Sequence, residues 1–196
     1  MPYSADHKQR TRARIVECAR MLFNRKGFTE VSIDEIMASA GLTRGGFYNH
    51  FRTKEELFVE AVAAYQEFNP LERWPGLDFD PQRCGSAFAR QMVDAYLSRE
   101  HLDDIEGHCP MIALPSDVAR AGPGVKHAYR GLLERMAGLL ARNADASVDA
   151  QAARRRGLAL AALCVGGMVL ARTIEDEAFR EEIRAAAHAT AHALID

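Results

Sequence analysis

The sequence predicts an all-α fold, with a small three-helix domain at the N-terminus that contains a helix-turn-helix, and a larger helical domain after it. Apolar residues recur at three- and four-residue intervals through most of the chain. Capping residues and glycines mark the expected starts and ends of two short helices between residues 32 and 57. Residues 1–54 carry ten Lys/Arg against five Asp/Glu, although the net charge of the 196-residue chain is −2. A basic module on an acidic body is typical of a small domain that faces a polyanion.

The first helix is expected from Asp6 to Lys26, where Gly27 stops it. Its apolar face contains Ile15, Ala19 and Phe23 at helical spacing. Four basic residues precede or open that face, and they fit either a solvated helix start or contact with DNA phosphates and the minor groove. The sequence leaves both open for Lys8, Arg10, Arg12 and Arg14.

The next two helices form the predicted helix-turn-helix. Ser32 can cap the first of them, and Glu35 three residues later completes a capping box. Gly41 stands where a left-handed residue ends that helix, and Thr43 can cap the second one. In helix-turn-helix proteins the second helix enters the major groove of DNA.

The second helix of the helix-turn-helix is expected over residues 44–50. It places Phe47 in the core and leaves polar side chains outside, and Phe51, just after the helix, is also expected in the core. An ordinary helical hairpin with a solvated face is the alternative. Two glycines in the first turn are poor helix formers, and they favour close backbone approach to a ligand instead. The predicted DNA-binding residues are therefore Ser32, Thr43, Arg44, Gly45, Gly46, Tyr48, Asn49 and His50, with Lys54.

Lys54 opens the fourth helix, which is expected over residues 54–68 and connects the two domains. A cation at a helix N-terminus conflicts with the helix dipole, and a bound phosphate would resolve that conflict. We therefore expect Lys54, like His50, to contact phosphate.

The run Ala-Gly-Leu-Thr-Arg-Gly-Gly-Phe-Tyr-Asn-His-Phe at 40–51, followed by Lys-Glu-Glu-Leu at 54–57, resembles the DNA-binding signature of the TetR family of transcriptional repressors. The motif is long and specific, and the resemblance covers roughly the first third of the chain. It implies a DNA-binding domain at residues 1–53, a ligand-binding and dimerisation domain at 54–196, and a homodimer formed by the last two helices.

The second domain begins with a loop at residues 69–80, in which Trp74 and Phe79 are possible lids over a ligand. Asp80 as a cap and Pro81 in the first turn predict a helix to about residue 99. Residues 101–123 are irregular apart from a short helix near 111–121. An amphipathic helix follows at 125–143.

Small residues line the last two helices, expected at 147–173 and 174–195. Gly166-Gly167 in mid-helix costs stability, which close helix contact would offset. Packing within one subunit is an alternative to the subunit interface that we prefer. The uncharged run 157–171 is too short to span a bilayer, so a helix buried all round in protein is expected, with no membrane association.

An effector cavity is expected between the helices that begin near residues 81 and 125. Plain core packing is the alternative for such side chains, but abundant methionine suits varied apolar ligands. The predicted lining residues are Phe88, Met92, Tyr96, Cys109, Met111, Tyr129 and Met136.

The four cysteines are scattered and no secretory signal is present, which indicates a reduced cytoplasmic protein. Pro110 suggests a helix start at Cys109, where a helix N-terminus would lower the thiol pKa. Some TetR regulators sense oxidants through a cysteine, so a redox-sensing repressor acting through Cys109 is an alternative function.

The sequence contains no nucleophile elbow and no phosphate-binding glycine loop, so it indicates no catalytic site. His188 and His192 have metal-ligand spacing, but no third ligand is near in sequence, so surface histidines are expected. We expect no cofactor, no metal and no catalysis; a helical enzyme is the remaining alternative. The sequence thus predicts a repressor that leaves a palindromic double-stranded operator when a small, mostly apolar effector binds.

Overall fold

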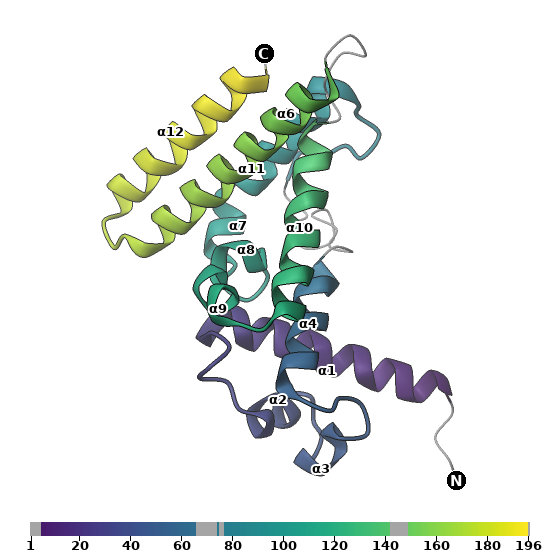
Figure 1. Cartoon of the computed structure of the whole chain (residues 1–196). Helices are drawn as coiled ribbons and strands as arrows, with labels where there is room; N and C mark the ends of the chain where they lie inside the picture. Colours follow the sequence, from purple (N-terminus) through teal and green to yellow (C-terminus); the bar gives the residue numbers. More distant parts are fainter. Residues whose placement is uncertain (1–4, 66–73, 75–76, 142–148, 196) are drawn as a thin grey trace. The chain divides into compact units, whose positions relative to one another are not determined.

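The computed structural model describes residues 5–65, 74, 77–141 and 149–195, and it confirms the all-α fold because helices are the regular elements throughout these ranges (Figure 1). The helices are α1 (Ala5–Lys26), α2 (Ile33–Ser39), α3 (Arg44–Phe47), α4 (Lys54–Ala64), α6 (Gly85–Tyr96), α7 (Arg99–Asp103), α8 (Pro110–Ala113), α9 (Pro115–Arg120), α10 (Pro123–Ala141), α11 (Ala150–Thr173) and α12 (Glu177–Ile195).

Contacts divide the chain into two compact units that do not follow the predicted boundary between residues 53 and 54. The first unit joins residues 1–68 to 105–132, and the second joins 69–104 to 133–196. Helix α10 passes from one unit to the other. Assignment of DNA binding to residues 1–53 and of effector binding to 54–196 stays a prediction.

An aromatic cluster forms the core of the first unit. Phe23 of α1 lies edge-on to Phe58 of α4, with ring centres 5.0 Å apart, and Phe28 stacks on Phe58 at 4.6 Å. Phe23 and Phe58 are fully buried. Burying such large rings stabilises the packing of α1 against α4.

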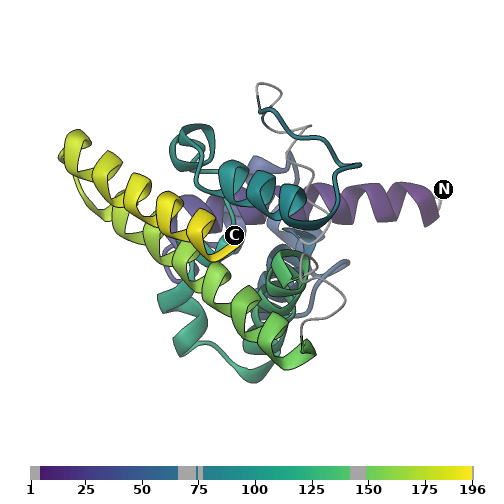
Figure 2. The same ribbon diagram turned by 90° about the horizontal axis from the view of Figure 1, so that it is seen from above.

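In the second unit, α11 and α12 lie side by side (Figures 1 and 2). A Cβ atom at Gly167 of α11 would lie 2.7 Å from Cβ of Ala187 in α12, so only glycine permits this approach. Gly157 is equally constrained, because its Cβ would lie 2.3 Å from the carbonyl oxygen of Ala137 in α10. Packing within one subunit, the alternative to the preferred interface, therefore accounts for these two glycines.

Within the single subunit, helix α11 is not buried all round, so the predicted complete burial requires a second subunit and stays a prediction. Ala162 and Leu170 are exposed, and 39% of its most apolar 18-residue window is buried. By length and composition α11 is the one helix among the described residues that could cross a membrane, although a core helix of a soluble protein meets the same criterion.

Helix α6 begins at Gly85 and not at Pro81, so this prediction was wrong. Gly85 has φ +65°, which a right-handed helix running through it from Pro81 could not accommodate. Gln91 also holds the preceding segment outside the helix, since its amide exchanges hydrogen bonds with the backbone of Asp80 at 2.8 and 3.0 Å.

The single short helix expected at 111–121 is two helices, α8 and α9, separated at Leu114.

Most of the predicted loop at 69–80 lies outside the described residues, but Trp74 is described and is buried rather than lid-like. Its indole Nε1 donates a hydrogen bond to Asp104 Oδ2 at 3.1 Å, and its ring lies 4.6 Å from that of His101. Burial lowers the pKa of His101 to about 4.

Candidate DNA interface

Helix α2 has the predicted N-terminal cap. Ser32 Oγ accepts a hydrogen bond from the backbone N–H of Glu35 at 3.1 Å. Lys26 donates to the Glu35 carboxylate at 2.5 Å; this bond first, and the Ser32 N–H as well, lower the pKa of Glu35. Lys26 ends α1, so the end of α1 is tied to the start of α2.

The turn between α2 and α3 depends on Gly41, whose φ of +65° is left-handed as predicted. The Leu42 N–H then donates to the Met37 carbonyl at 2.8 Å and closes the helix end. Thr43 is the N-cap residue of α3, but its side chain makes no capping hydrogen bond. The exposed Thr43 hydroxyl therefore remains available for an external acceptor.

Helix α3 is shorter than expected and ends at Phe47. Turns continue it, because the N–H groups of Asn49 and His50 donate to the carbonyls of Gly46 and Phe47 at 3.2 and 2.9 Å. Phe47 and Phe51 are buried, as predicted for core positions. The remaining side chains of α3 and its turn, namely Arg44, Tyr48 and Asn49, are exposed.

The two glycines of α3 differ in their surroundings. A Cβ atom at Gly45 would meet nothing within 4 Å, whereas one at Gly46 would lie 3.5 Å from Met37 Cε, an ordinary contact. Neither glycine is therefore needed for packing inside the chain. Their presence in the first turn agrees with close approach of an external molecule.

Arg44 is paired with an acidic residue of α2. Its Nη1 donates to Asp34 Oδ2 at 2.7 Å, and both side chains are largely exposed. Sequence reasoning did not find this pair. The feature that could have predicted it is the opposite charge of Asp34 and Arg44, which lie in the first turns of two adjacent short helices.

The ammonium group of Lys54 points to backbone rather than outward. It donates to the carbonyl oxygens of Phe28 and Val31, both at 2.8 Å, and lies 4.3 Å above the Phe28 ring. Burial lowers the pKa of Lys54. Lys54 thus fixes the chain between α1 and α2. Its third hydrogen faces the carbonyl oxygen of Thr29 at a longer 3.5 Å, so the predicted phosphate contact competes with that weaker bond.

Arg12 is not a solvated residue at the start of a helix, because it ties α1 to other parts of the first unit. Its contact with DNA phosphate stays a prediction. Its Nε donates to Glu60 Oε2 of α4 at 3.1 Å, its guanidinium lies 3.9 Å from the Phe51 ring centre, and Nη1 donates to the His50 carbonyl.

Burial first, and then the charges of Lys8 and Arg12, lower the pKa of His50. Its Nδ1 is buried without a hydrogen-bond partner in the described part of the chain.

The predicted effector residues are divided between the two units. Cys109, Met111 and Tyr129 belong to the first unit, where Tyr129 Oη donates to the Met111 carbonyl at 3.5 Å. Burial, followed by the nearby Cys109, raises the pKa of Tyr129 to about 12. The residues in the second unit are Phe88 and Met92, both half-buried, and Tyr96 and Met136, both buried. A cavity lined by these side chains stays a prediction.

Cys109 caps α8 at its N-terminus, as the following proline predicted. The residue is 1% exposed, and the preceding His108 is fully buried. An oxidant in solution reaches this thiol only if the surrounding structure opens. The redox-sensing alternative stays a prediction.

A short capped helix, a left-handed glycine turn and a second short helix with polar exposed side chains together make a helix-turn-helix. They lie in the basic N-terminal part of the chain, and these features define the DNA-binding domain of a transcriptional regulator. Residues 15–61 match the family described as bacterial regulatory proteins, tetR family.

Similar proteins agree with this match. The chain is 35% identical over 96 residues to the HTH-type transcriptional regulator SrpR of Pseudomonas putida, covering 47% of this chain and 42% of SrpR. It is also 35% identical over 96 residues to TtgW, an uncharacterized HTH-type transcriptional regulator of the same species, covering 67% of TtgW. A TetR transcriptional regulator from Chloroflexus aurantiacus superposes with TM-score 0.69 at 26% identity, covering 93% and 94% of the two chains. The chain belongs to the TetR family of transcriptional regulators.

Proposed function

We propose that this chain is a ligand-responsive repressor that binds a palindromic operator as a homodimer. The observation that supports this proposal is the outer side of α3, where Arg44, Tyr48 and Asn49 are exposed. A Cβ atom added at Gly45, between them, would meet none of the described residues within 4 Å. Two such helices can enter successive major grooves on one side of DNA when they stand about 34 Å apart. An effector that prefers a different separation weakens operator binding.

Within the proposed interface the exposed residues have separate roles. Arg44 has the length and the donor geometry to read a guanine edge once it leaves Asp34. The hydroxyls of Thr43 and Tyr48, together with His50, suit phosphate oxygens, which position the protein but do not read sequence. Gly45 and Gly46 allow the backbone to approach DNA, and Ser32 and Asn49 complete the surface.

Dimerisation is proposed through α11 and α12. Three large apolar side chains on these helices are strongly exposed: Leu170 at 57%, Phe179 at 49% and Leu194 at 42%. A Cβ atom at Gly166 would meet nothing within 4 Å among the residues that the structure describes, so a second subunit has room to approach there. Exposed apolar surface of this kind favours association.

The proposed effector is small and mostly apolar, since the predicted lining is rich in methionine and aromatic side chains. The proposed location is the cytoplasm, where operator DNA and a reduced environment are found. The relatives named above are transcriptional regulators, and the proposal assigns the chain no enzymatic activity.

The promoter next to the chain's own gene provides the test. We expect the wild-type protein to protect a palindrome in it from nuclease cleavage, and to bind it with an affinity that falls steeply with salt. Arg44→Ala should cost about 1–3 kcal/mol and relax specificity at one base pair in each half-site. Absence of any sequence preference over unrelated DNA would contradict the proposal.

Lys54→Ala tests the phosphate contact separately. If Lys54 meets DNA, all sequences should bind more weakly and the salt slope should flatten by about one unit. The control is Lys126→Ala, which removes an exposed lysine of α10. Equal salt slopes for wild type and Lys54→Ala would contradict the phosphate contact and leave Lys54 only its structural bonds with the Phe28 and Val31 carbonyls.

A further inference from the structure

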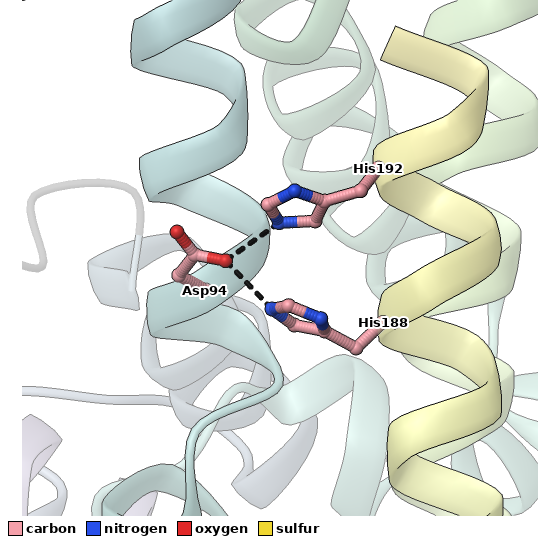
Figure 3. Close-up of side chains that lie close together, drawn as sticks. All are labelled: Asp94, His188 and His192. Atoms are coloured by element: carbon pink, nitrogen blue, oxygen red, sulfur yellow. Dashed lines mark hydrogen bonds and ion pairs between the residues drawn. The ribbon is translucent and has the colours of Figure 1, made fainter. Parts of the chain in front are cut away.

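Two histidines of α12 and one aspartate of α6 meet in the second unit (Figure 3). Asp94 Oδ1 lies 2.7 Å from Nε2 of His188 and 2.7 Å from Nε2 of His192. The two imidazole rings stack with centres 4.3 Å apart, and the three ligand atoms lie within 4.8 Å of one another. The sequence supplied the histidine pair but not its partner, which is more than 90 residues away.

We propose that Asp94, His188 and His192 bind a first-row transition-metal dication, with Zn²⁺ as the reference ion, and so link α6 to α12. Two imidazole nitrogens and one carboxylate oxygen form a donor set that suits zinc and its neighbours, whereas Mg²⁺ and Ca²⁺ prefer oxygen ligands. Three protein ligands leave a fourth position for water. This site goes beyond the proposed repressor function and is testable without DNA.

Asp94 Oδ1 needs a small movement away from each histidine nitrogen to admit an ion. Metal–ligand bonds of about 2.0–2.2 Å in a tetrahedral site place ligand atoms roughly 3.3 Å apart, compared with the 2.7 Å of the present hydrogen bonds. The side chains have room for this adjustment, because Asp94, His188 and His192 are 50%, 38% and 24% exposed.

Arg90 determines which ring nitrogen of His192 carries the hydrogen in the metal-free protein. Its Nη1 lies 2.8 Å from Nδ1 of His192, and because a guanidinium only donates, Nδ1 accepts and Nε2 carries the hydrogen shared with Asp94. Binding of zinc at Nε2 moves that hydrogen to Nδ1, so Arg90 must release the ring. Arg90 is half-buried at the edge of the cluster and one helical turn before Asp94.

The alternative is an ion-free cluster in which both imidazoles donate hydrogen bonds to the carboxylate and join the two helices directly. Titration of tag-free, full-length protein with Zn²⁺ against a chromophoric chelator separates the two, with Mg²⁺ as the comparison ion. We expect one zinc per chain and no competition from Mg²⁺. Zn²⁺ should also raise the melting temperature of the wild type, because it binds the folded state.

Single substitutions locate the site. His188→Ala, His192→Ala and Asp94→Ala should each weaken zinc binding by more than the roughly 10–100-fold typical of losing an outer-shell partner. His127→Ala removes an exposed histidine of α10, and Cys84→Ser removes an exposed thiol beside α6; both should bind zinc like the wild type. Bound Co²⁺ should show visible d–d absorption without a thiolate charge-transfer band.

Circular dichroism of each metal-free variant establishes that it is folded, and His188→Gln, His192→Gln or Asp94→Asn replaces the alanine variant at the same position if that variant is not folded. Zinc affinity that survives in the folded Asp94 and histidine variants would overturn the proposal. Loss of binding in Cys84→Ser, or no zinc bound by the wild type, would overturn it equally.

Discussion

Arg44 of α3 donates a hydrogen bond to Asp34 of α2 over 2.7 Å, with 62% and 58% of the two side chains exposed. An exposed ion pair contributes only about 0–1 kcal/mol to folding. Its larger consequence concerns DNA, because the proposed base-reading guanidinium is held by a carboxylate that phosphates would repel. The free protein thus keeps its candidate specificity residue partly neutralised.

Asp34→Asn should release Arg44 and remove one negative charge from the interface. We expect affinity for operator and for unrelated DNA to rise by about 1 kcal/mol, roughly fivefold, at low salt, with the gain fading as salt increases. Fluorescence anisotropy at several salt concentrations measures this. Glu100→Gln, an equal charge change at an exposed position of α7, is the control. Weaker operator binding by Asp34→Asn would mean instead that Asp34 orients Arg44 for its base.

Gly45→Ala should separate folding from DNA binding. The added methyl group meets nothing within 4 Å, and alanine favours helix over glycine, so the free energy of unfolding should stay equal or rise by up to about 1 kcal/mol. Operator affinity should fall because the methyl group obstructs the backbone's approach to DNA. Gly138→Ala, at a similarly open and exposed position of α10, should change folding alone. Unchanged operator affinity in Gly45→Ala would remove the close-approach argument.

Gly166 and Gly167 should respond differently to substitution. Gly167→Ala places Cβ 2.7 Å from Ala187 Cβ and should lower the free energy of unfolding of the chain itself. Gly166→Leu enters open space in the chain, so it should leave the subunit folded and produce monomers or aggregates that lose operator binding. Sedimentation and urea unfolding distinguish these effects. A wild-type protein that sediments as a monomer at micromolar concentration would contradict the proposed dimer.

His101 should make stability depend on pH. Its folded pKa of about 4 lies below the ordinary value of 6.5, so between these values the unfolded chain binds a proton that the native chain excludes. The free energy of unfolding should therefore fall as pH drops from 6.5 to 4, by up to about 1.4 kcal/mol per pH unit, with no contribution above 6.5.

His101→Gln should lose that part of the slope, measured by urea unfolding at pH 7 and pH 5. Carboxylates titrate in the same interval, so the readout is the difference between wild type and variant, about 2 kcal/mol between the two pH values. His127→Gln, at an exposed histidine, should behave as wild type. Parallel pH profiles for wild type and His101→Gln would contradict the assignment.

The sequence by itself determined the features that depend on neighbours three or four residues away. The Ser32 cap, the left-handed turn at Gly41 and the end of α1 before Gly27 all follow from local backbone chemistry and appear in the structure as expected. The burial of Phe47 and Phe51 follows from helical periodicity in the same way. Local hydrogen bonding and side-chain periodicity leave a direct trace in the order of residues.

Only the tertiary structure decided features that join distant residues. The ammonium group of Lys54 donates to the carbonyls of Phe28 and Val31, which the fold brings within its reach. Gln91 binds the backbone of Asp80 and so keeps that segment out of α6. Asp94 completes the histidine pair of α12 from across 94 residues of chain. Gly167 packs against Ala187, while its neighbour Gly166 faces open space, because adjacent residues of a helix point in different directions.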